Sequence, residues 1–251
     1  MEPSNNTTKS EKHAVEIKKP KKSSNSRFLY DLKKSTKAKF AIIVIFIVSL
    51  FAILAPILTP YDPVTTDLMA RLKPPVPFRY SVVSHPLGTD ALGRDIWARI
   101  VYGARVSLLV GITSVIISGC IGVTLGLIAG YFGGIVDDII MRIADILLAF
   151  PFILLMLAVL AVIGPGLGNM ILVLGLTGWV SYARVVRGEV LSLREKEFVE
   201  SARSLGASNM RIIFKHILPN VVNSVIVVAS FAVASTIITE ATLSFLGLGV
   251  K

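Results

Sequence analysis

The chain has 251 residues, of which 53% are hydrophobic and 17% charged, and its mean hydropathy is +0.72. This composition is too apolar for an ordinary soluble domain and indicates a membrane protein in contact with lipid. The net charge of +10 is more simply explained by cytoplasmic anchors beside apolar segments, because no nucleic-acid recognition motif accompanies it. We therefore expect no nucleic-acid partner. The single cysteine, Cys120, lies within an apolar segment and supports neither a disulfide nor a thiol metal cluster.

Residues 1–27 are rich in Lys, Ser and Asn and show no apolar period, which predicts a disordered cytoplasmic tail. Residues 28–59 combine a short interfacial segment with a first membrane-spanning helix at 40–59. At about 1.5 Å per residue, this helix covers the roughly 30 Å hydrocarbon layer. Basic residues outnumber acidic ones before it, so the amino terminus should lie in the cytoplasm.

An extracytoplasmic segment is predicted at 60–104, and it begins with several turn-forming prolines. Within it, His85 is predicted to be a turn residue, and Asp90, Arg94 and Asp95 to form a capping and ion-pair cluster. A metal site needs several converging ligands, and one histidine is weak evidence for it. We therefore expect no metal here.

The remaining residues, 105–251, contain four further apolar segments, near 108–129, 146–163, 169–187 and 221–238. In the first of these, small residues recur every four positions and so lie along one helix face. This small-residue stripe consists of Ser114, Ser118, Gly122, Gly126 and Gly130. Such a stripe lets another helix approach closely, which is a main source of helix association in lipid. We expect it to pack against another transmembrane helix rather than to face lipid.

An acidic stretch, 135–145, precedes the third span. On a helix, Asp138 and Arg142 are four residues apart, and Arg142 and Asp145 three apart, so both pairs can form. Carboxylates next to a membrane raise the alternative of an intramembrane aspartyl protease. These lack an activating arrangement and have a cation among them, which argues against that enzyme.

The segment 188–218 is polar and basic, although it lies between two apolar segments. Its pattern predicts a helix, a break at Gly206, and a second helix over 208–218 that ends before Pro219. Ser208 or Asn209 should cap the second helix by accepting from its first amides. The basic charge of this loop places it in the cytoplasm. The count of spans agrees, because a chain that starts inside and crosses the membrane four times returns to the cytoplasm.

Glu240 lies close to the end of the last apolar segment, where an ionisable group is a functional candidate by default. It could line a pathway or cap a helix, and the Gly-rich residues after it favour the structural role. The chain then stops at Lys251. Either it is a fragment that lacks a sixth helix, or the protein ends outside with five spans.

The loop carries a recognisable spacing. The residues Glu200-Ser201-Ala202, then Gly206 after three residues, then His216-Ile-Leu218-Pro219 after nine more, resemble the EAA signature of ABC importer permeases. Ser201 replaces an alanine of that signature. His216 replaces an isoleucine, and this change resembles the peptide and nickel branch of the family. The short motifs that start at His85, Gly93 and Tyr102 resemble the DppC/OppC type within that branch.

This resemblance implies an all-α integral membrane protein, a polytopic helical bundle with five visible spans in a bacterial inner membrane. It implies a permease that forms half of an import pathway for di- or oligopeptides, with 188–218 as the coupling loop that docks an ATPase. The implied partners are a second permease of the DppB/OppB type, two ATPases of the DppD/DppF or OppD/OppF type, and an extracellular solute-binding protein.

Two alternatives remain for the function. One is the same machine with nickel or another metal chelate as cargo. The other is an ion-coupled secondary transporter, which would be expected to carry ionisable groups in mid-span, where the apolar segments have none. The chain also lacks a Gly-x4-Gly-Lys phosphate loop and common catalytic motifs. We therefore expect no catalytic residue and no bound cofactor, with ATP and Mg²⁺ held by the partner ATPase.

Overall fold

The computed structural model describes residues 34–78 and 84–249. The predicted tail, 1–27, and the start of the interfacial segment lie outside the described residues. The chain divides into two compact units, Met1–Ile47 and Val48–Lys251. Helix α2 (Thr36–Leu58) crosses that boundary and is apolar throughout most of its length. In the first unit, the large apolar side chains of this helix, such as Phe40 and Ile45, are exposed, as suits a helix that faces lipid.

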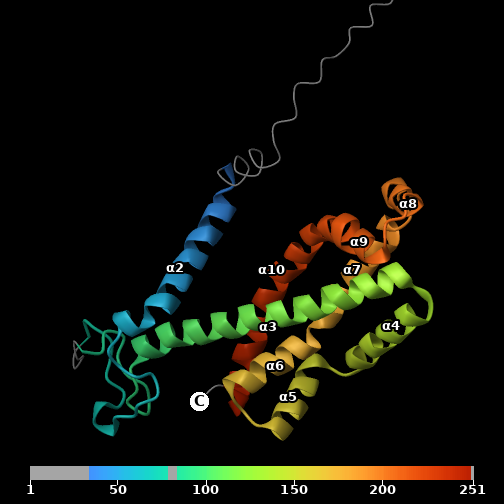
Figure 1. The fold of residues 1–251 in the computed structure, drawn as a ribbon. Helices are drawn as coiled ribbons and strands as arrows, with labels where there is room; N and C mark the ends of the chain where they lie inside the picture. Colours follow the sequence, from blue (N-terminus) through green and yellow to red (C-terminus); the bar gives the residue numbers. More distant parts are fainter. Residues whose placement is uncertain (1–33, 79–83, 250–251) are drawn as a thin grey trace, which may run out of the picture. The chain divides into compact units, whose positions relative to one another are not determined.

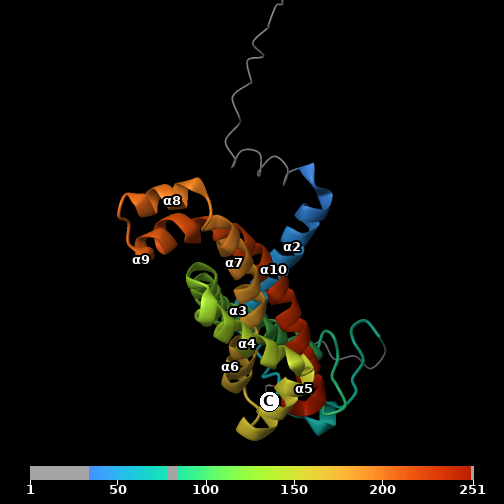
Figure 2. The ribbon, with the colours of Figure 1, turned by 90° about the vertical axis from the view of Figure 1, so that its right-hand side faces the viewer.

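Most helices of the second unit are joined by short connections, and a longer segment, described at 71–78 and 84–95, precedes α3 (Figures 1 and 2). Its elements are η1 (Leu68–Ala70), α3 (Ile96–Phe132), α4 (Gly134–Ala149), α5 (Phe152–Ile163), α6 (Leu167–Thr177), α7 (Trp179–Leu193), α8 (Glu197–Ser204), α9 (Asn209–Arg211), η2 (Ile212–Ile217), α10 (Leu218–Leu243) and η3 (Ser244–Leu248). The long helix α3 is central and packs against α7, α10, α6 and α4. Its arrangement agrees with the predicted all-α membrane fold.

Four helical segments of the described residues are long and apolar enough to cross a membrane. They are α2, α3, the α6–α7 segment Leu167–Leu193, and the segment Asn209–Leu248. Each of the last three is longer than the apolar segment expected from sequence. Helix α3 starts at Ile96 because the Asp95 side chain caps it there, accepting a hydrogen bond from the Ala98 amide at 2.7 Å.

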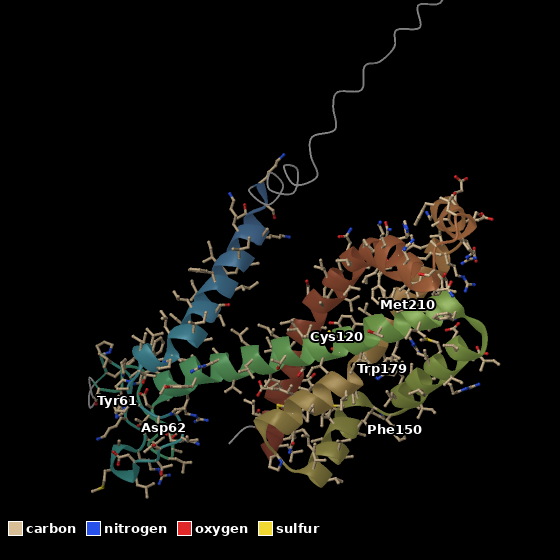
Figure 3. The ribbon with its side chains drawn as sticks, in the orientation of Figure 1. Tyr61, Asp62, Cys120, Phe150, Trp179 and Met210 are labelled. Carbon is tan, nitrogen blue, oxygen red and sulfur yellow. The ribbon has the colours of Figure 1, made fainter. Side chains whose placement is uncertain are left out.

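The span predicted at 146–163 falls on two helices, α4 and α5, which are bent by 88° at a break between them. Phe150 has extended backbone angles, φ −96° and ψ 137°, immediately before Pro151. Proline disfavours helical geometry in the residue before it, so α4 must end there and α5 must start in a new direction. Figure 3 labels Phe150 at this break. The two helices together form at most one broken span.

The small-residue stripe of α3 lies against α7 and α6. A Cβ atom on Gly122 would lie 2.4 Å from the Trp179 carbonyl oxygen, and one on Gly126 would lie 2.7 Å from the Ala183 carbonyl oxygen. A Cβ atom on Gly130 would lie 2.7 Å from the Val190 Cβ atom and 3.0 Å from the Arg187 carbonyl oxygen. The structure thus places backbone against backbone along this face, where only a missing side chain permits the contact.

The stripe continues toward α6 with its two serines, which are buried. The Ser114 hydroxyl donates to the Ile171 carbonyl of α6 at 3.3 Å. The Ser118 hydroxyl bonds within its own helix, to the Val115 carbonyl at 3.2 Å. One polar contact therefore joins α3 to α6, while the glycines hold α3 to α7.

Ion pairs link α4 to α7, and here the sequence prediction fails. We expected Arg142 to pair with Asp138 and Asp145 within α4, but no ion pair of the described residues includes Arg142. Instead Asp145 accepts from Arg184 at 2.6 Å, and Asp137 accepts two hydrogen bonds from Arg187. Asp137 and Asp145 thus pair with arginines of α7 rather than within α4.

Replacing Gly122 with Ala should destabilise the protein by about 1–3 kcal/mol, the usual cost of overpacking. The new methyl group meets a backbone carbonyl, which cannot move aside as a side chain can. Gly103→Ala on the same helix is the matched control, because no atom lies within 4 Å of its Cβ position. Thermal unfolding in detergent should show a lower midpoint for the Gly122 variant alone. Equal midpoints would contradict the close packing of α3 and α7.

Candidate functional site

The segment 188–218 forms a helical hairpin at one end of α3 and α7, where α8 and α9 lie side by side (Figures 1 and 2). Helix α8 ends in a Schellman motif: the Gly206 amide donates to the Arg203 carbonyl at 2.9 Å, and the Ala207 amide to the Ala202 carbonyl at 3.0 Å. Gly206 has φ +79°, the left-handed conformation that this motif requires. The predicted break therefore has a defined geometry.

The capping prediction for the second helix is wrong. Ser208 occupies the cap position, but its side chain makes no capping hydrogen bond. The Asn209 side chain accepts instead from the Tyr131 hydroxyl of α3 at 2.9 Å. A tertiary contact, which sequence spacing does not reveal, has taken the side chain that was expected to cap the helix.

The second helix also does not stop before Pro219. It continues through the π-helical turn η2 into α10, and the Leu218 amide donates to the Ile213 carbonyl five residues back. Pro219 has no amide hydrogen with which to bond the preceding turn. The wide turn lies directly before it, so the helix axis continues across the proline. His216 is half-buried within this turn. Its carbonyl oxygen accepts a hydrogen bond from the Asn220 side chain at 2.6 Å.

The hairpin is anchored by apolar side chains on one face. Val199, Ile212, Ile213 and Ile217 are buried in one cluster with Leu127 and Tyr131 of α3, and with Val186 and Val190 of α7. Leu218 and Ala202 pack against the same cluster. Any displacement of the hairpin must therefore move α3, α7 or α10, because close-packed side chains transmit strain.

Four large apolar side chains of the hairpin are exposed, which sequence reasoning missed. The exposed fractions are 88% for Leu205, 60% for Met210, 56% for Phe214 and 41% for Phe198. We call these four residues the apolar docking surface; Met210 is labelled in Figure 3. Glu200 and Ser201 are exposed beside it. The sequence did contain a signal for these exposed residues, namely helical spacing. Phe198 and Leu205 are seven residues apart, and Met210 and Phe214 are four apart. Several large apolar side chains exposed on one hairpin favour an interaction site.

A hollow of about 490 Å³ lies where α6 meets α7, beside α10 and the start of α5. Its lining is rich in hydroxyl groups, and none of the described residues that line it is charged. The hydroxyl-bearing residues are Ser118, Thr177, Ser181, Tyr182, Ser235, Thr236 and Thr239. The buried Tyr182 hydroxyl has no hydrogen-bond partner among the described residues. The surface can therefore offer hydrogen bonds to a polar molecule without selecting for its charge.

The predicted cluster before α3 is assembled around Asp90. Its carboxylate accepts from the Leu92 amide at 2.8 Å, from the Arg94 amide at 3.0 Å and side chain at 2.8 Å, and from Arg99 at 2.5 Å. Burial raises the pKa of Asp90, but the hydrogen bonds from Arg94 and Leu92 outweigh it and lower the pKa to about 2. The structure thus stabilises the charged form of this carboxylate.

His85 joins the same segment through Asp95. Its Nδ1 lies 3.1 Å from Asp95 Oδ1, and the other Asp95 oxygen caps α3. His85 also stacks on Tyr61, with the ring centroids 4.7 Å apart. No group of three or more metal-binding side chains occurs in the described residues. His85 therefore supports the cap of α3.

Glu240 lies near the end of α10 and is buried, with 5% of its surface exposed. Its two carboxylate oxygens accept from Ser107 of α3 and from Ser244 of η3, each at 2.8 Å. It also lines a second hollow, of about 610 Å³, between α3, α10 and the segment that precedes α3. It thus joins two helices and borders an open space.

Comparison with known proteins now assigns the chain. Residues 122–251 match the family described as "Binding-protein-dependent transport system inner membrane component", and residues 25–75 match the "N-terminal TM domain of oligopeptide transport permease C". The OppC oligopeptide transport permease of Bacillus subtilis is 43% identical over 85% of this chain and 68% of that relative. The chain belongs to this family of transport permeases.

Two further relatives are also named as transport permeases. The DppC dipeptide transport permease of Alkalihalophilus pseudofirmus is 45% identical over 88% of this chain and 70% of that protein. The DppC permease of Bacillus subtilis is 38% identical over 96% and 73%. The predicted family is thereby confirmed. The permease is a membrane component of a transport system and not an enzyme, since its relatives are named as permeases.

A solved structure supports the fold of the permease. A chain of the MetNI methionine ABC transporter superposes with a TM-score of 0.50 at 23% identity, over 58% of this chain and 73% of that one. At this identity the likeness concerns the fold alone. The helical architecture around α3 is therefore shared with that chain.

The cluster around Asp90 predicts acid sensitivity. Because the folded pKa is lowered, its stabilisation is complete above the ordinary value of 3.8 and is lost as the pH falls toward 2. Asp90→Asn should remove this part of the pH dependence. The unfolding midpoint of the wild type should drop more steeply between about pH 5 and pH 2.5 than that of the variant, measured by thermal scans in detergent. Parallel profiles would contradict the role of Asp90.

Proposed function

We propose that this permease imports di- or oligopeptides as one half of the translocation pathway of an ABC importer. Its segment 188–218 is the coupling loop on which a separate ATPase subunit docks. The observation that carries the proposal is the helical hairpin, which exposes four large apolar side chains and is anchored to α3, α7 and α10 by a buried cluster. The names of the OppC and DppC relatives support peptides as the cargo.

The hairpin can transmit motion because of its two kinds of contact. An ATPase that binds the apolar docking surface buries Leu205 and Met210, the most exposed members of this surface, and gains free energy from that burial. Closure of the ATPases on binding ATP then displaces the hairpin as one body, since the Schellman motif at Gly206 fixes its two halves relative to each other. The buried cluster below it passes the displacement to α3, α7 and α10.

The long helical segment Asn209–Leu248 leads from the hairpin to Glu240. At about 1.5 Å per residue it is long enough to cross the bilayer, so a shift at the coupling loop reaches the other side of the membrane. Rocking of the helices would alternate the pathway between inward-facing and outward-facing states. The binding protein would then release its peptide into the open pathway.

The hydroxyl-lined hollow suits peptide cargo. Peptides share a polar backbone but differ in side-chain charge, and the described residues lining this hollow are uncharged. Hydroxyl groups both donate and accept hydrogen bonds, so they serve the amides and carbonyls of any sequence. We assign this hollow to the pathway surface that the permease contributes.

The proposed assembly contains a homologous second permease of the DppB/OppB type, two ATPases of the DppD/DppF or OppD/OppF type, and an extracellular solute-binding protein. ATP and Mg²⁺ are held by the ATPases, and this chain binds no cofactor. The amino terminus lies in the cytoplasm, on the same side of the bacterial inner membrane as the coupling loop.

Reconstituted transport tests this proposal. Proteoliposomes that contain the permease with its partner permease, ATPases and binding protein should accumulate labelled di- or oligopeptides only when ATP is supplied. Chelated nickel, offered separately, is the control for cargo. Accumulation of nickel without peptide would contradict the peptide assignment while leaving the importer mechanism, and uptake independent of ATP would contradict the mechanism itself.

The conformation of Gly206 predicts a coupling defect. Gly206→Val forces a β-branched residue to φ +79°, which costs about 1–3 kcal/mol and disfavours the Schellman motif. Its Cβ would meet no atom within 4 Å, so a defect must come from the backbone and not from a clash. We expect normal insertion in the membrane but peptide uptake reduced about tenfold or more.

Gly206→Asn is the matched control, because Asn tolerates the left-handed conformation better than other residues. It should keep most of the transport activity. Transport by the valine variant at the wild-type rate would contradict the role of the break in coupling.

A further inference from the structure

Glu240 is a buried carboxylate without a counter-charge among the described residues. It is 5% exposed, and none of the ion pairs in residues 34–78 and 84–249 includes it. Within the described part of the chain, its oxygens accept only from the hydroxyls of Ser107 and Ser244. Two neutral donors orient a carboxylate but do not neutralise it. A buried charge of this kind is costly unless a cation arrives to pair with it.

The carboxylate borders space that a ligand can enter. The hollow of about 610 Å³ that it lines, here called the Glu240 hollow, falls in the usual size range of small-molecule sites. Ala241 and Val106 provide part of its apolar wall. A cation that enters this hollow therefore lies beside Glu240.

The opposite charge occurs on another wall. Arg94 and Arg99, which both contact Asp90, also line the Glu240 hollow. Half of the Arg99 side chain remains accessible, at 45% of its surface. A carboxylate on one wall and guanidinium groups on another match a zwitterion, with one anionic and one cationic end. A small peptide with free termini is such a molecule.

We propose that the Glu240 hollow binds the free termini of a peptide, with Glu240 receiving the terminal ammonium group and Arg99 facing the terminal carboxylate. The inference rests on the proposed peptide cargo. It gives Glu240 a binding role in addition to its hydrogen bonds between α3 and η3. The ammonium replaces the missing counter-charge, and a peptide with a blocked amino terminus cannot do so.

Thiol labelling beside Glu240 tests the charge. Cys120, the single cysteine, is replaced by Ser, and Ala241→Cys places a thiol in the wall of the hollow. In the assembled transporter, a cationic methanethiosulfonate should label this thiol faster than an anionic one. Glu240→Gln should lower that ratio of rates about tenfold, because the negative charge is removed. Thr66→Cys, at an exposed position that does not line the hollow, is the control whose ratio should not change.

Protection by peptides tests the ligand and needs no change at Glu240. Millimolar Ala-Ala should slow labelling of the thiol introduced by Ala241→Cys at least twofold, while N-acetyl-Ala-Ala should not. Equal protection by both peptides, or by neither, would overturn the proposal. A ratio of labelling rates that is the same with Glu240 and with Gln would overturn it too, since Glu240 would then be uncharged or shielded.

Two further comparisons separate this inference from its alternatives. Ser244→Ala removes one hydroxyl donor and keeps the charge, so the selective protection by Ala-Ala should persist; its loss would show that Glu240 acts only through its hydrogen bonds. ATP-driven peptide uptake is measured on the same proteoliposomes. Absent uptake in the wild type contradicts the proposed function, whereas normal uptake without selective protection contradicts only the role of Glu240.

Discussion

The close approach of α3 and α7 is the contact on which the rest of the structure depends. Gly122, Gly126 and Gly130 bring the two backbones together, at distances where any side chain would collide with a carbonyl or a Cβ atom. In lipid there is no hydrophobic force to drive helices together, so contact at this range supplies the packing energy. The coupling hairpin is anchored on the pair that the stripe creates, since its buried cluster includes side chains from both helices.

Polar contacts then position the elements around this pair. Arg184 and Arg187 hold α4 against α7 through Asp145 and Asp137. The Arg187–Asp137 pair is the less exposed of the two, so water competes less for it than for the exposed Arg184–Asp145 pair. The Tyr131 hydroxyl ties the hairpin to α3 in the same way. Packing therefore sets which helices meet, and a few polar side chains set their register.

The parts of the structure that follow from local pattern could be predicted from the sequence. The apolar segments indicated the membrane class, the period of four indicated a packing face, and Gly206 indicated a break between helices. The parts that depend on tertiary partners could not be predicted. Asn209 was expected to cap a helix but bonds Tyr131, 78 positions away in sequence. The direction of the bend at Pro151 is equally non-local, because proline ends a helix without determining where the next one points.

The uninterrupted helix through η2 and Pro219 has a thermodynamic consequence. One element connects the docking surface, around Met210, with the carboxylate of Glu240, so the two ends do not have independent energies. If a peptide at Glu240 favours one tilt of this helix, it changes the affinity of the hairpin for the ATPase by some factor. Thermodynamic linkage requires that the docked ATPase change the affinity for the peptide by the same factor. Binding of the peptide and docking of the ATPase would thus be coupled through a single continuous helix.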